Sequence, residues 1–156
     1  MANGYPMAAV TTSKKIMSAF NHSYFNTYGA GILQCRLGLE VLDILRDENL
    51  PENASKLGDY FLKEFKKIQK KTKRILDVRG SGFMIALEFI KDPETKEEDP
   101  QLTSLILDEV KNHGVLFAKA GENGNIVRIV GPLCLTQKDA EKVVHALDSA
   151  VTKHAL

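Results

Sequence analysis

The sequence predicts an α+β fold, in which helices pack on an antiparallel sheet. The expected order of elements is helix, helix, strand, strand, helix, strand, strand, helix. Each strand pair is joined by a short glycine-containing turn, at residues 80–82 and 121–124, and short turns connect antiparallel neighbours. Helices that flank these pairs can bury their apolar faces on one sheet, which gives a layered architecture.

The segment before about residue 33 does not match this pattern. Residues 3–6 (NGYP) have the residue types of a turn, and Met7 to Thr12 is predicted as a short strand of apolar and β-branched residues. That strand has no partner nearby in the sequence. Ser18 to Gly31 mixes aromatic, glycine and polar residues, and is predicted to be an irregular, partly buried loop. We therefore expect part of another domain here.

Two helices follow this segment. Residues 32–46 are predicted as the first, because leucine, isoleucine and valine recur at spacings of three and four. Further apolar residues outside that stripe predict burial on more than one face. Asn49, with Glu52 three residues later, is the predicted N-cap of the second helix. Its predicted buried stripe is Leu57, Phe61, Phe65 and Ile68.

The first predicted strand pair comes next. Residues 75–79 and 83–90 are rich in apolar and β-branched side chains, and Gly80-Ser81-Gly82 separates them as a tight turn. Residues 91–100 are predicted as a polar surface loop. An amphipathic helix is expected over residues 101–112.

The remaining elements complete the module. Gly114 is the predicted residue that ends the preceding helix in a left-handed conformation. Residues 115–118 and 125–130 are predicted as the second strand pair. Thr136, with Asp139 three residues later, predicts a capping box at the start of the last helix.

Composition excludes several classes of protein. A formal net charge of +1 and the lack of an apolar run of about 20 residues give no reason to expect nucleic acid or a membrane as a partner. Cys35 and Cys134 match no metal-ligand or redox spacing and are predicted to be buried free thiols, with a disulfide as the alternative. The histidines are scattered, so we expect no metal site; they are His22, His113, His145 and His154.

Thr27 is the first candidate binding residue. It stands in the stretch FNTYGAG, beside two glycines and just before the helix expected from Ile32. A hydroxyl, free backbone N–H groups and a helix N-terminus together suit a phosphate. The alternative is a purely local role for the hydroxyl as an N-cap or in a turn.

Arg128 is the second candidate. It is a guanidinium inside the otherwise apolar strand NIVRIVGPL. Such an arginine can simply reach solvent, or it can present two parallel N–H donors to a substrate carboxylate. The pattern alone leaves both roles open.

The stretches around these residues resemble the class III pyridoxal-phosphate-dependent aminotransferases, especially the alanine–glyoxylate aminotransferase 2 group. The matching stretches occur in family order and cover nearly the whole chain: NGYPMAAVTT, FNTYG, LEVLDILRDENLPENASKLGDYF, DVRGSGFMIALEF and GVLFAKAGENGNIVRIVGPLCLT, followed by the final helix. The resemblance implies the C-terminal portion of a fold-type I enzyme. Residues 1–32 would be a remnant of the large PLP-binding domain, and residues 33–156 the small C-terminal domain.

The resemblance also assigns site residues. In the family, NGYP closely follows the Schiff-base lysine, which would align two residues before Met1, so no catalytic residue is assigned within this chain. Thr27 matches the threonine that contacts the cofactor phosphate of the neighbouring subunit. Arg128 matches the arginine that binds the substrate α-carboxylate. The family commonly has Asn-Pro where this chain has Gly31-Ile32, so the phosphate-facing loop departs from the family pattern.

The activity implied is that of a dimeric mitochondrial enzyme. It would use pyridoxal 5'-phosphate to move an amino group from alanine to glyoxylate or a related 2-oxo acid, and without the lysine the chain alone would be inactive. One alternative is a related class III enzyme, an ethanolamine-phosphate phospho-lyase or an ω-amino-acid transaminase. Another is a non-catalytic truncated chain that pairs with a full-length subunit.

Overall fold

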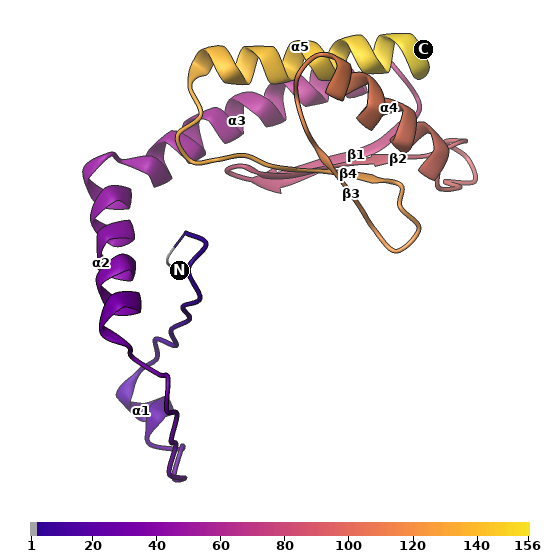
Figure 1. Cartoon of the computed structure of the whole chain (residues 1–156). Helices are drawn as coiled ribbons and strands as arrows, with labels where there is room; N and C mark the ends of the chain where they lie inside the picture. The colour runs from indigo at the N-terminus through magenta and orange to yellow at the C-terminus, as the bar shows by residue number, and fades with distance from the viewer. Residues whose placement is uncertain (1–2) are drawn as a thin grey trace. The chain divides into compact units, whose positions relative to one another are not determined.

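The computed structural model of the chain describes residues 3–156, and Figure 1 shows its helices and strands. The chain forms two compact units, divided between Asn49 and Leu50, and each is described by itself. This division reflects compactness alone. The predicted boundary between a large-domain remnant and a small domain, after residue 32, stays a prediction.

The first unit contains two helices, α1 (Lys14–Met17) and α2 (Ile32–Asp47). Helix α1 was not predicted from the sequence; it begins where the Ser13 side chain accepts a hydrogen bond from the Ile16 N–H at 3.3 Å. The strand predicted over residues 7–12 is wrong, because those residues form no strand in the structure. A strand requires a hydrogen-bonded neighbour, and residues 3–49 supply none for this segment.

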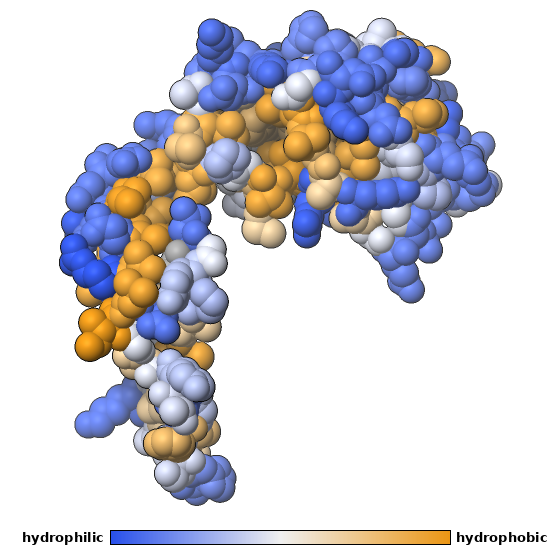
Figure 2. Space-filling model, viewed as in Figure 1, coloured by the Kyte–Doolittle hydropathy of each residue, from blue (hydrophilic) through white to orange (hydrophobic). Residues whose placement is uncertain are grey.

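The first predicted helix is confirmed as α2, but the prediction that it is buried on more than one face is wrong. Gly38 is its only buried residue within the part of the chain that the structure describes. A Cβ at that position would lie 2.5 Å from the Met7 sulfur, so the missing side chain permits this contact. Figure 2 shows an apolar stripe along α2. Its exposed apolar residues are Ile32, Leu33, Leu39, Leu42 and Ile44.

The second unit confirms the predicted antiparallel sheet covered by helices. Figure 1 shows the helices on one side of the sheet, and the strand order is β1-β2-β4-β3 with every neighbouring pair antiparallel. Its elements are α3 (Leu50–Gln69), β1 (Ile75–Ser81), β2 (Met84–Phe89), α4 (Pro100–Asn112), β3 (Ala118–Ala120), β4 (Ile126–Val130) and α5 (Gln137–His154).

The core of this unit lies between the helices and the sheet. The predicted stripe of α3 is buried as expected, and the rings of Phe61 and Phe65 stack with their centroids 5.4 Å apart. Alternate residues of the strands supply the other wall, among them Leu87 and Val127. One face of the sheet is therefore closed by helices, while the side chains of the other face point away from this core.

The predicted β1–β2 hairpin is confirmed, but its turn lies at residues 82–83 and not at 80–82, because Gly80 and Ser81 pair with Ile85 and Met84 at the end of β1. This turn lies close to α3. Gly82 has a φ of +53°, a conformation that glycine adopts without strain. A Cβ at Gly58 of α3 would lie 2.6 Å from the Gly82 Cα. The two backbones can approach this closely only because residue 58 has no side chain.

The start of α4 is held by a buried carboxylate that sequence reasoning missed. Asp99 is 4% exposed, caps the helix by accepting the Leu102 N–H at 2.8 Å, and forms an ion pair with Arg74. The Arg74 Nε also donates to the Ile90 carbonyl at 2.8 Å. Residues 91–100 were predicted as polar surface loop, so the burial of Asp99 is a correction, explained by this ion pair and cap.

Other sequence predictions are wrong in detail. Asn49 directly precedes α3, but its side chain forms no capping hydrogen bond with any described residue. Its φ of +50° is left-handed, which is typical of a residue that follows a helix. Strand β3 begins at Ala118, where the predicted strand 115–118 was expected to end. Cys134 is exposed and Cys35 partly exposed, both as free thiols, so neither is the buried thiol expected. The loop of residues 18–31 is irregular as predicted, but it is exposed up to residue 30.

The predicted capping box of α5 is confirmed and makes stability depend on pH. The Thr136 hydroxyl donates to Asp139 at 2.6 Å, the Thr136 N–H donates at 3.0 Å, and the Asp139 N–H donates to the Thr136 hydroxyl oxygen at 3.2 Å. The bonds from Thr136 hold the pKa of Asp139 below its ordinary 3.8. A carboxyl group with a lowered folded-state pKa stabilises the fold above its unfolded-state pKa.

We expect the stabilisation of the fold by ionised Asp139 to be lost as the pH falls through this lowered pKa. Urea unfolding of the parent chain and Asp139→Asn should differ most at neutral pH and least at about pH 2. Asp108→Asn, on the exposed side of α4, is the control. A parent–Asp139→Asn difference that is unchanged by pH would contradict the prediction.

Candidate functional site

Thr27 lies in an exposed turn of the first unit, and its neighbour Asn26 builds that turn. The Asn26 side-chain oxygen accepts the Tyr28 N–H at 3.1 Å, and its carbonyl accepts the Gly29 N–H at 3.2 Å. The Thr27 side chain forms no hydrogen bond with any of residues 3–156. It therefore has neither of the local roles that the sequence left open. Asn26 was missed, although asparagine before a glycine-containing turn is a recognisable signal.

The start of α2 lies just after this turn and is not capped. Gly31 is the N-cap residue and provides no side-chain hydrogen bond, while Ala30 is left-handed with a φ of +55°. The first backbone N–H groups of a helix have no partner within the helix. A free hydroxyl and uncapped N–H groups can each bind a phosphate oxygen, so the residue types present are compatible with the predicted phosphate contact.

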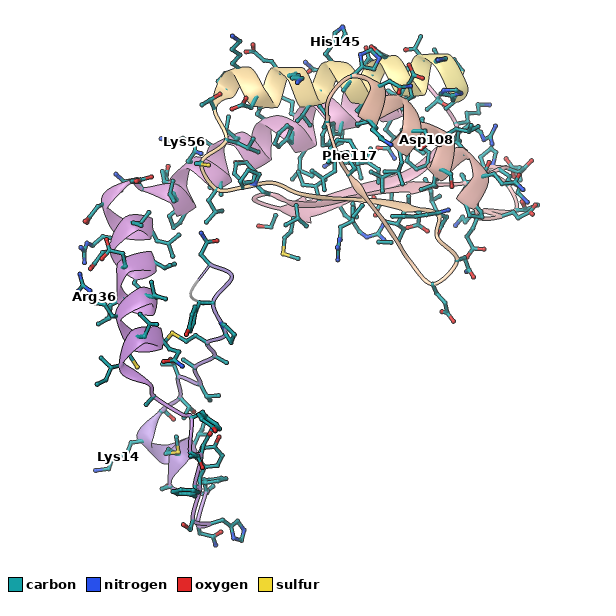
Figure 3. All side chains as sticks on the ribbon, viewed as in Figure 1. Lys14, Arg36, Lys56, Asp108, Phe117 and His145 are labelled. Carbon is teal, nitrogen blue, oxygen red and sulfur yellow. The ribbon has the colours of Figure 1, made fainter. Side chains whose placement is uncertain are left out.

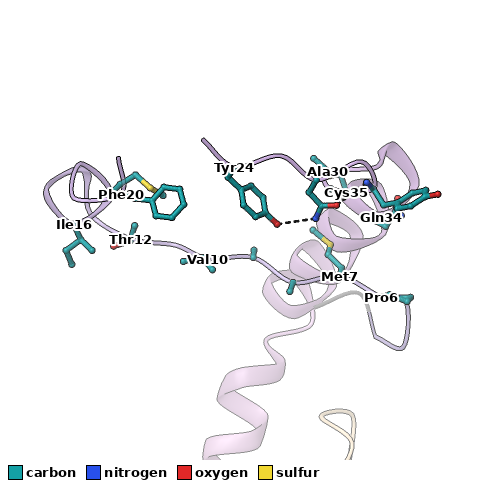
Figure 4. A pocket seen from close by; sticks show the side chains of 16 residues that line it. Pro6, Met7, Val10, Thr12, Ile16, Phe20, Tyr24, Ala30, Gln34 and Cys35 are labelled. Atoms are coloured by element: carbon teal, nitrogen blue, oxygen red, sulfur yellow. Dashed lines mark hydrogen bonds between the residues drawn. The ribbon is translucent and has the colours of Figure 1, made fainter. Parts of the chain in front are cut away.

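A groove of about 1200 Å³ lies beside the turn in the first unit, as Figure 4 shows. Its walls are mainly apolar and include Met7, Val10, Phe20 and Cys35. The Tyr24 hydroxyl accepts a hydrogen bond from the Asn26 amide at 3.2 Å on one side. Thr27 itself does not line the groove, although its neighbours Asn26 and Tyr28 do.

Arg128 lies on β4, which is an interior strand of the sheet. Its neighbours Val127 and Ile129 are buried against the helices, whereas Arg128 is exposed. Because side chains alternate along a strand, Arg128 stands on the face without helices, called here the open face. The guanidinium thus extends from a backbone that is hydrogen-bonded on both sides, to β2 and to β3.

The surroundings of Arg128 leave its guanidinium accessible. Directly opposite it are Ala86 on β2 and Ala118 on β3, and neither methyl group can cover a long side chain. Met84 and Val130, both exposed, add apolar surface to the same face. The Arg128 side chain has no ion pair or hydrogen bond with any described residue. Its fork of N–H donors is therefore free to bind a carboxylate.

A second arginine of the open face, Arg79, is not free. Its Nη1 donates to Asp77 at 2.9 Å and to Glu88 at 2.8 Å. The bond to Asp77, followed by that to Glu88, raises the pKa of Arg79 above its ordinary value. Sequence reasoning missed this residue, although Asp77 and Arg79 alternate along one strand and so share a face.

The histidines form no catalytic or metal-binding group in the described structure. His145 points outward from α5 in Figure 3, and its ring lies 5.9 Å from that of His113. No three His, Cys, Asp or Glu side chains gather as metal ligands within residues 3–156. Over the same residues, no helix combines the length and apolar character needed to cross a bilayer.

Thr27 and Arg128 belong to different compact units, so each site is defined within its own unit. Thr27 contributes a hydroxyl near an uncapped helix start, and Arg128 contributes a free guanidinium. Both groups have hydrogen-bond donors that suit an anion.

Known proteins with similar sequences were compared with this chain. A 38% identical relative is the alanine–glyoxylate aminotransferase 2 homolog 2 of Arabidopsis thaliana, named as mitochondrial; the match covers 98% of this chain and 32% of the relative. The ethanolamine-phosphate phospho-lyase homolog 1 of Caenorhabditis elegans is 36% identical, over 97% of this chain and 33% of the relative. The chain thus spans about a third of the length of these curated relatives.

Solved structures agree with this relationship. A phospholyase from Arthrobacter, in complex with phosphoethanolamine, matches with a TM-score of 0.90 and 26% identity, over 97% of this chain and 36% of that one. An amine transaminase from an uncultivated Pseudomonas species, in a PLP-bound form, matches with a TM-score of 0.75 and 34% identity, over 88% and 31%. The sequence profile of the family Aminotransferase class-III matches residues 1–151. The chain therefore belongs to the class III aminotransferase family.

Proposed function

We propose that this chain acts in pyridoxal-phosphate-dependent transfer of an amino group from alanine to glyoxylate or a related 2-oxo acid. The observation that carries the proposal is the unpaired Arg128 guanidinium on the open face, in a chain of this family. Relatives named as alanine–glyoxylate aminotransferase 2 support the choice of amino donor and acceptor.

Arg128 has the role of binding the substrate carboxylate. Its planar guanidinium can donate two parallel N–H bonds to the two carboxylate oxygens, which fixes the orientation as well as the position of an amino acid. The same bonds serve the amino acid and the oxo acid, because both carry a carboxylate. The small side chains of Ala86 and Ala118 leave room for the ligand on both flanks.

Thr27 has the role of holding the cofactor phosphate, and by the family resemblance that cofactor belongs to the neighbouring subunit. The free hydroxyl donates to a phosphate oxygen, while the uncapped N–H groups at the start of α2 favour negative charge. When bound, pyridoxal phosphate supplies the electron sink of its pyridine ring. The active form would then be a dimer, in which this chain supplies a residue to its partner's site.

The covalent lysine of the reaction is not supplied by these 156 residues at the family position. Lys14 and Lys15 follow the NGYP turn, whereas the family lysine precedes it. The proton transfers of transamination need such a basic group at the reacting carbon. We therefore expect the isolated chain to be inactive, and the active species to include the lysine-bearing part.

A phospho-lyase acting on ethanolamine phosphate is the second candidate. It is favoured by the name of the nematode relative and by the TM-score of 0.90 to the phospholyase from Arthrobacter. Its substrate carries a phosphate in place of a carboxylate, and an arginine can bind either group. An ω-amino-acid transaminase remains an alternative of the same family, and a non-catalytic chain that pairs with a longer subunit is an alternative of a different class.

The test is to isolate the native protein from its source with an antibody against residues 137–156. We expect a species about three times the 17.3 kDa of this chain, in mitochondria as the names of the relatives suggest. It should form pyruvate from alanine when glyoxylate is supplied. The recombinant 156-residue chain with added pyridoxal phosphate should form none.

Each other outcome selects an alternative. Release of inorganic phosphate from ethanolamine phosphate, without pyruvate formation, would replace the transaminase with the phospho-lyase. Pyruvate formation by the recombinant chain alone would overturn the requirement for an external lysine. A native species of only 17.3 kDa, inactive and bound to a longer subunit, would favour the non-catalytic partner.

A further inference from the structure

Four charged side chains share a small area of the open face. Asp77 on β1 and Glu88 on β2 stand directly opposite one another. In the adjacent row that points to the same face, Arg79 on β1 and Arg128 on β4 stand on either side of Ala86. Two carboxylates and two guanidiniums are therefore available to pair with one another.

The register places Glu88 within reach of both arginines. Glu88 pairs with Asp77 on one side, two residues from Arg79, and with Ile126 on the other side, two residues from Arg128. Such diagonal neighbours lie about 7–8 Å apart, a distance that long side chains can span. By strand register alone, Glu88 can pair with either guanidinium.

Among residues 3–156, Glu88 forms an ion pair with Arg79 alone. Arg79 donates to Glu88 and to Asp77 at the same time, and Glu88 is the more buried of the two acids, with 24% of its side chain exposed against 49%. Arg128 is left without a partner among the described residues. Both arginines are exposed on the open face, and they differ in that Arg79 has acidic partners and Arg128 has none among the described residues.

We propose that Arg79 is a positioning residue: it holds Glu88 away from Arg128 and so keeps the Arg128 guanidinium free for a carboxylate ligand. This inference rests on the proposed function, because it concerns the ligand of Arg128. Without Arg79, Glu88 would lose its cation, and Arg128 is the other arginine that lies diagonal to it across the strands. Glu88 would then pair with Arg128 and compete with the ligand.

The test compares Arg79→Gln with Arg79→Gln/Glu88→Gln in the isotopically labelled 156-residue chain. Acetate is the probe, and the NMR signals of the Arg128 guanidinium report both acetate binding and pairing with Glu88. In Arg79→Gln we expect restricted guanidinium rotation without acetate, and an acetate affinity about two- to fivefold lower, as fits an exposed ion pair. The double variant should recover the parent affinity.

Two further variants distinguish the loss of the Arg79–Glu88 ion pair from the loss of a positive charge in general. Lys119→Gln removes one positive charge from the same sheet, but Lys119 turns to the helix side, where its amino group donates to the Ser104 hydroxyl at 2.8 Å and the Pro100 carbonyl at 3.0 Å. It should bind acetate like the parent. Arg79→Lys keeps a cation beside Glu88 and should also retain most of the affinity.

The outcomes distinguish this inference from the proposed function. If acetate binds Arg128 equally in the parent and in Arg79→Gln, the positioning role is overturned while the carboxylate role stands. If Arg128 pairs with Glu88 in Arg79→Gln but acetate perturbs Arg128 in none of the chains, the carboxylate role fails and the separation of Glu88 from Arg128 stands. A loss of affinity in Lys119→Gln as large as in Arg79→Gln would also overturn the inference.

Discussion

Gly58→Val is expected to lower the free energy of unfolding of the 50–156 unit by about 3 kcal/mol, the upper end for overpacking. The Cβ of any side chain at this position would lie 2.6 Å from the Cα of Gly82 and 2.7 Å from its carbonyl carbon. Both are backbone atoms of a tight turn, so a rotamer change cannot relieve the overlap. Helix α3 or the β1–β2 hairpin must move. Urea unfolding followed by circular dichroism measures the loss.

The matched control for this substitution is Lys56→Val. It places the same β-branched residue in the same helix, but Lys56 is exposed, with 73% of its side chain accessible, and Figure 3 shows it labelled on α3. Its effect should be limited to helix propensity, about 0.5 kcal/mol, and to the loss of its exposed ion pair with Glu52, which contributes little to stability. Equal urea midpoints of unfolding for the two variants would contradict this prediction, because they would show that a side chain at residue 58 fits between α3 and the hairpin.

Arg74→Met is expected to destabilise the same unit by about 3 kcal/mol, the lower end for breaking a buried ion pair. Asp99 would keep the hydrogen bond from the Leu102 N–H but lose the cation that compensates its burial. Because 35% of the Arg74 side chain is exposed, water replaces part of the lost interaction. Thermal and urea unfolding would measure the change.

Removing the buried charge should restore part of this loss. In Arg74→Met/Asp99→Asn the neutral amide needs no counter-ion, while its oxygen can still accept the Leu102 N–H. Lys91→Met is the control, since Lys91 pairs with Glu97 at the exposed surface of the neighbouring loop; we expect no measurable change. If Arg74→Met is as stable as Lys91→Met, the Arg74–Asp99 pair does not stabilise the start of α4.

Local signals predicted much of the second unit. The Thr136–Asp139 capping box and the β1–β2 hairpin depend on residues that are close in the sequence, and both are confirmed, although the turn of the hairpin lies at residues 82–83 and not at 80–82. The stripe of α3 is likewise a property of one helix. Such features depend on neighbours at spacings of two to four, which a single sequence displays directly.

Features that depend on distant partners were missed. The Arg74–Asp99 ion pair joins residues separated by 25 positions, and the burial of Asp99 follows from that pair. The strand expected at residues 7–12 failed for the converse reason, because apolar and β-branched residues favour a strand but cannot show whether a partner exists. Strand β3 consists of residues 118–120, which pair with β4. The position of this strand is set by its pairing with β4, which the composition of residues 115–120 does not reveal.

In the candidate site, too, the local features were predicted and the features that depend on distant residues were missed. The place of Arg128 in an otherwise apolar strand predicted that it either reaches solvent or binds a substrate carboxylate, and in the structure Arg128 is exposed, which is compatible with both roles. That it is unpaired, and that Arg79 engages Glu88, depends on the order of the strands and on their register. The roles of Thr27 and Arg128 toward a ligand stay predictions.

The interior position of β4 has a consequence for how this face can change over evolution. Because β4 is hydrogen-bonded to β2 and β3, its backbone is fixed by the sheet and serves as a frame. Its exposed side chains, by contrast, are not packed in the core. Exchanging the residues opposite Arg128, at positions 86 and 118, would alter the shape of the surrounding surface without altering the frame. Under the proposed role of Arg128, a change of anion preference would therefore need side-chain substitutions alone, with the fold preserved.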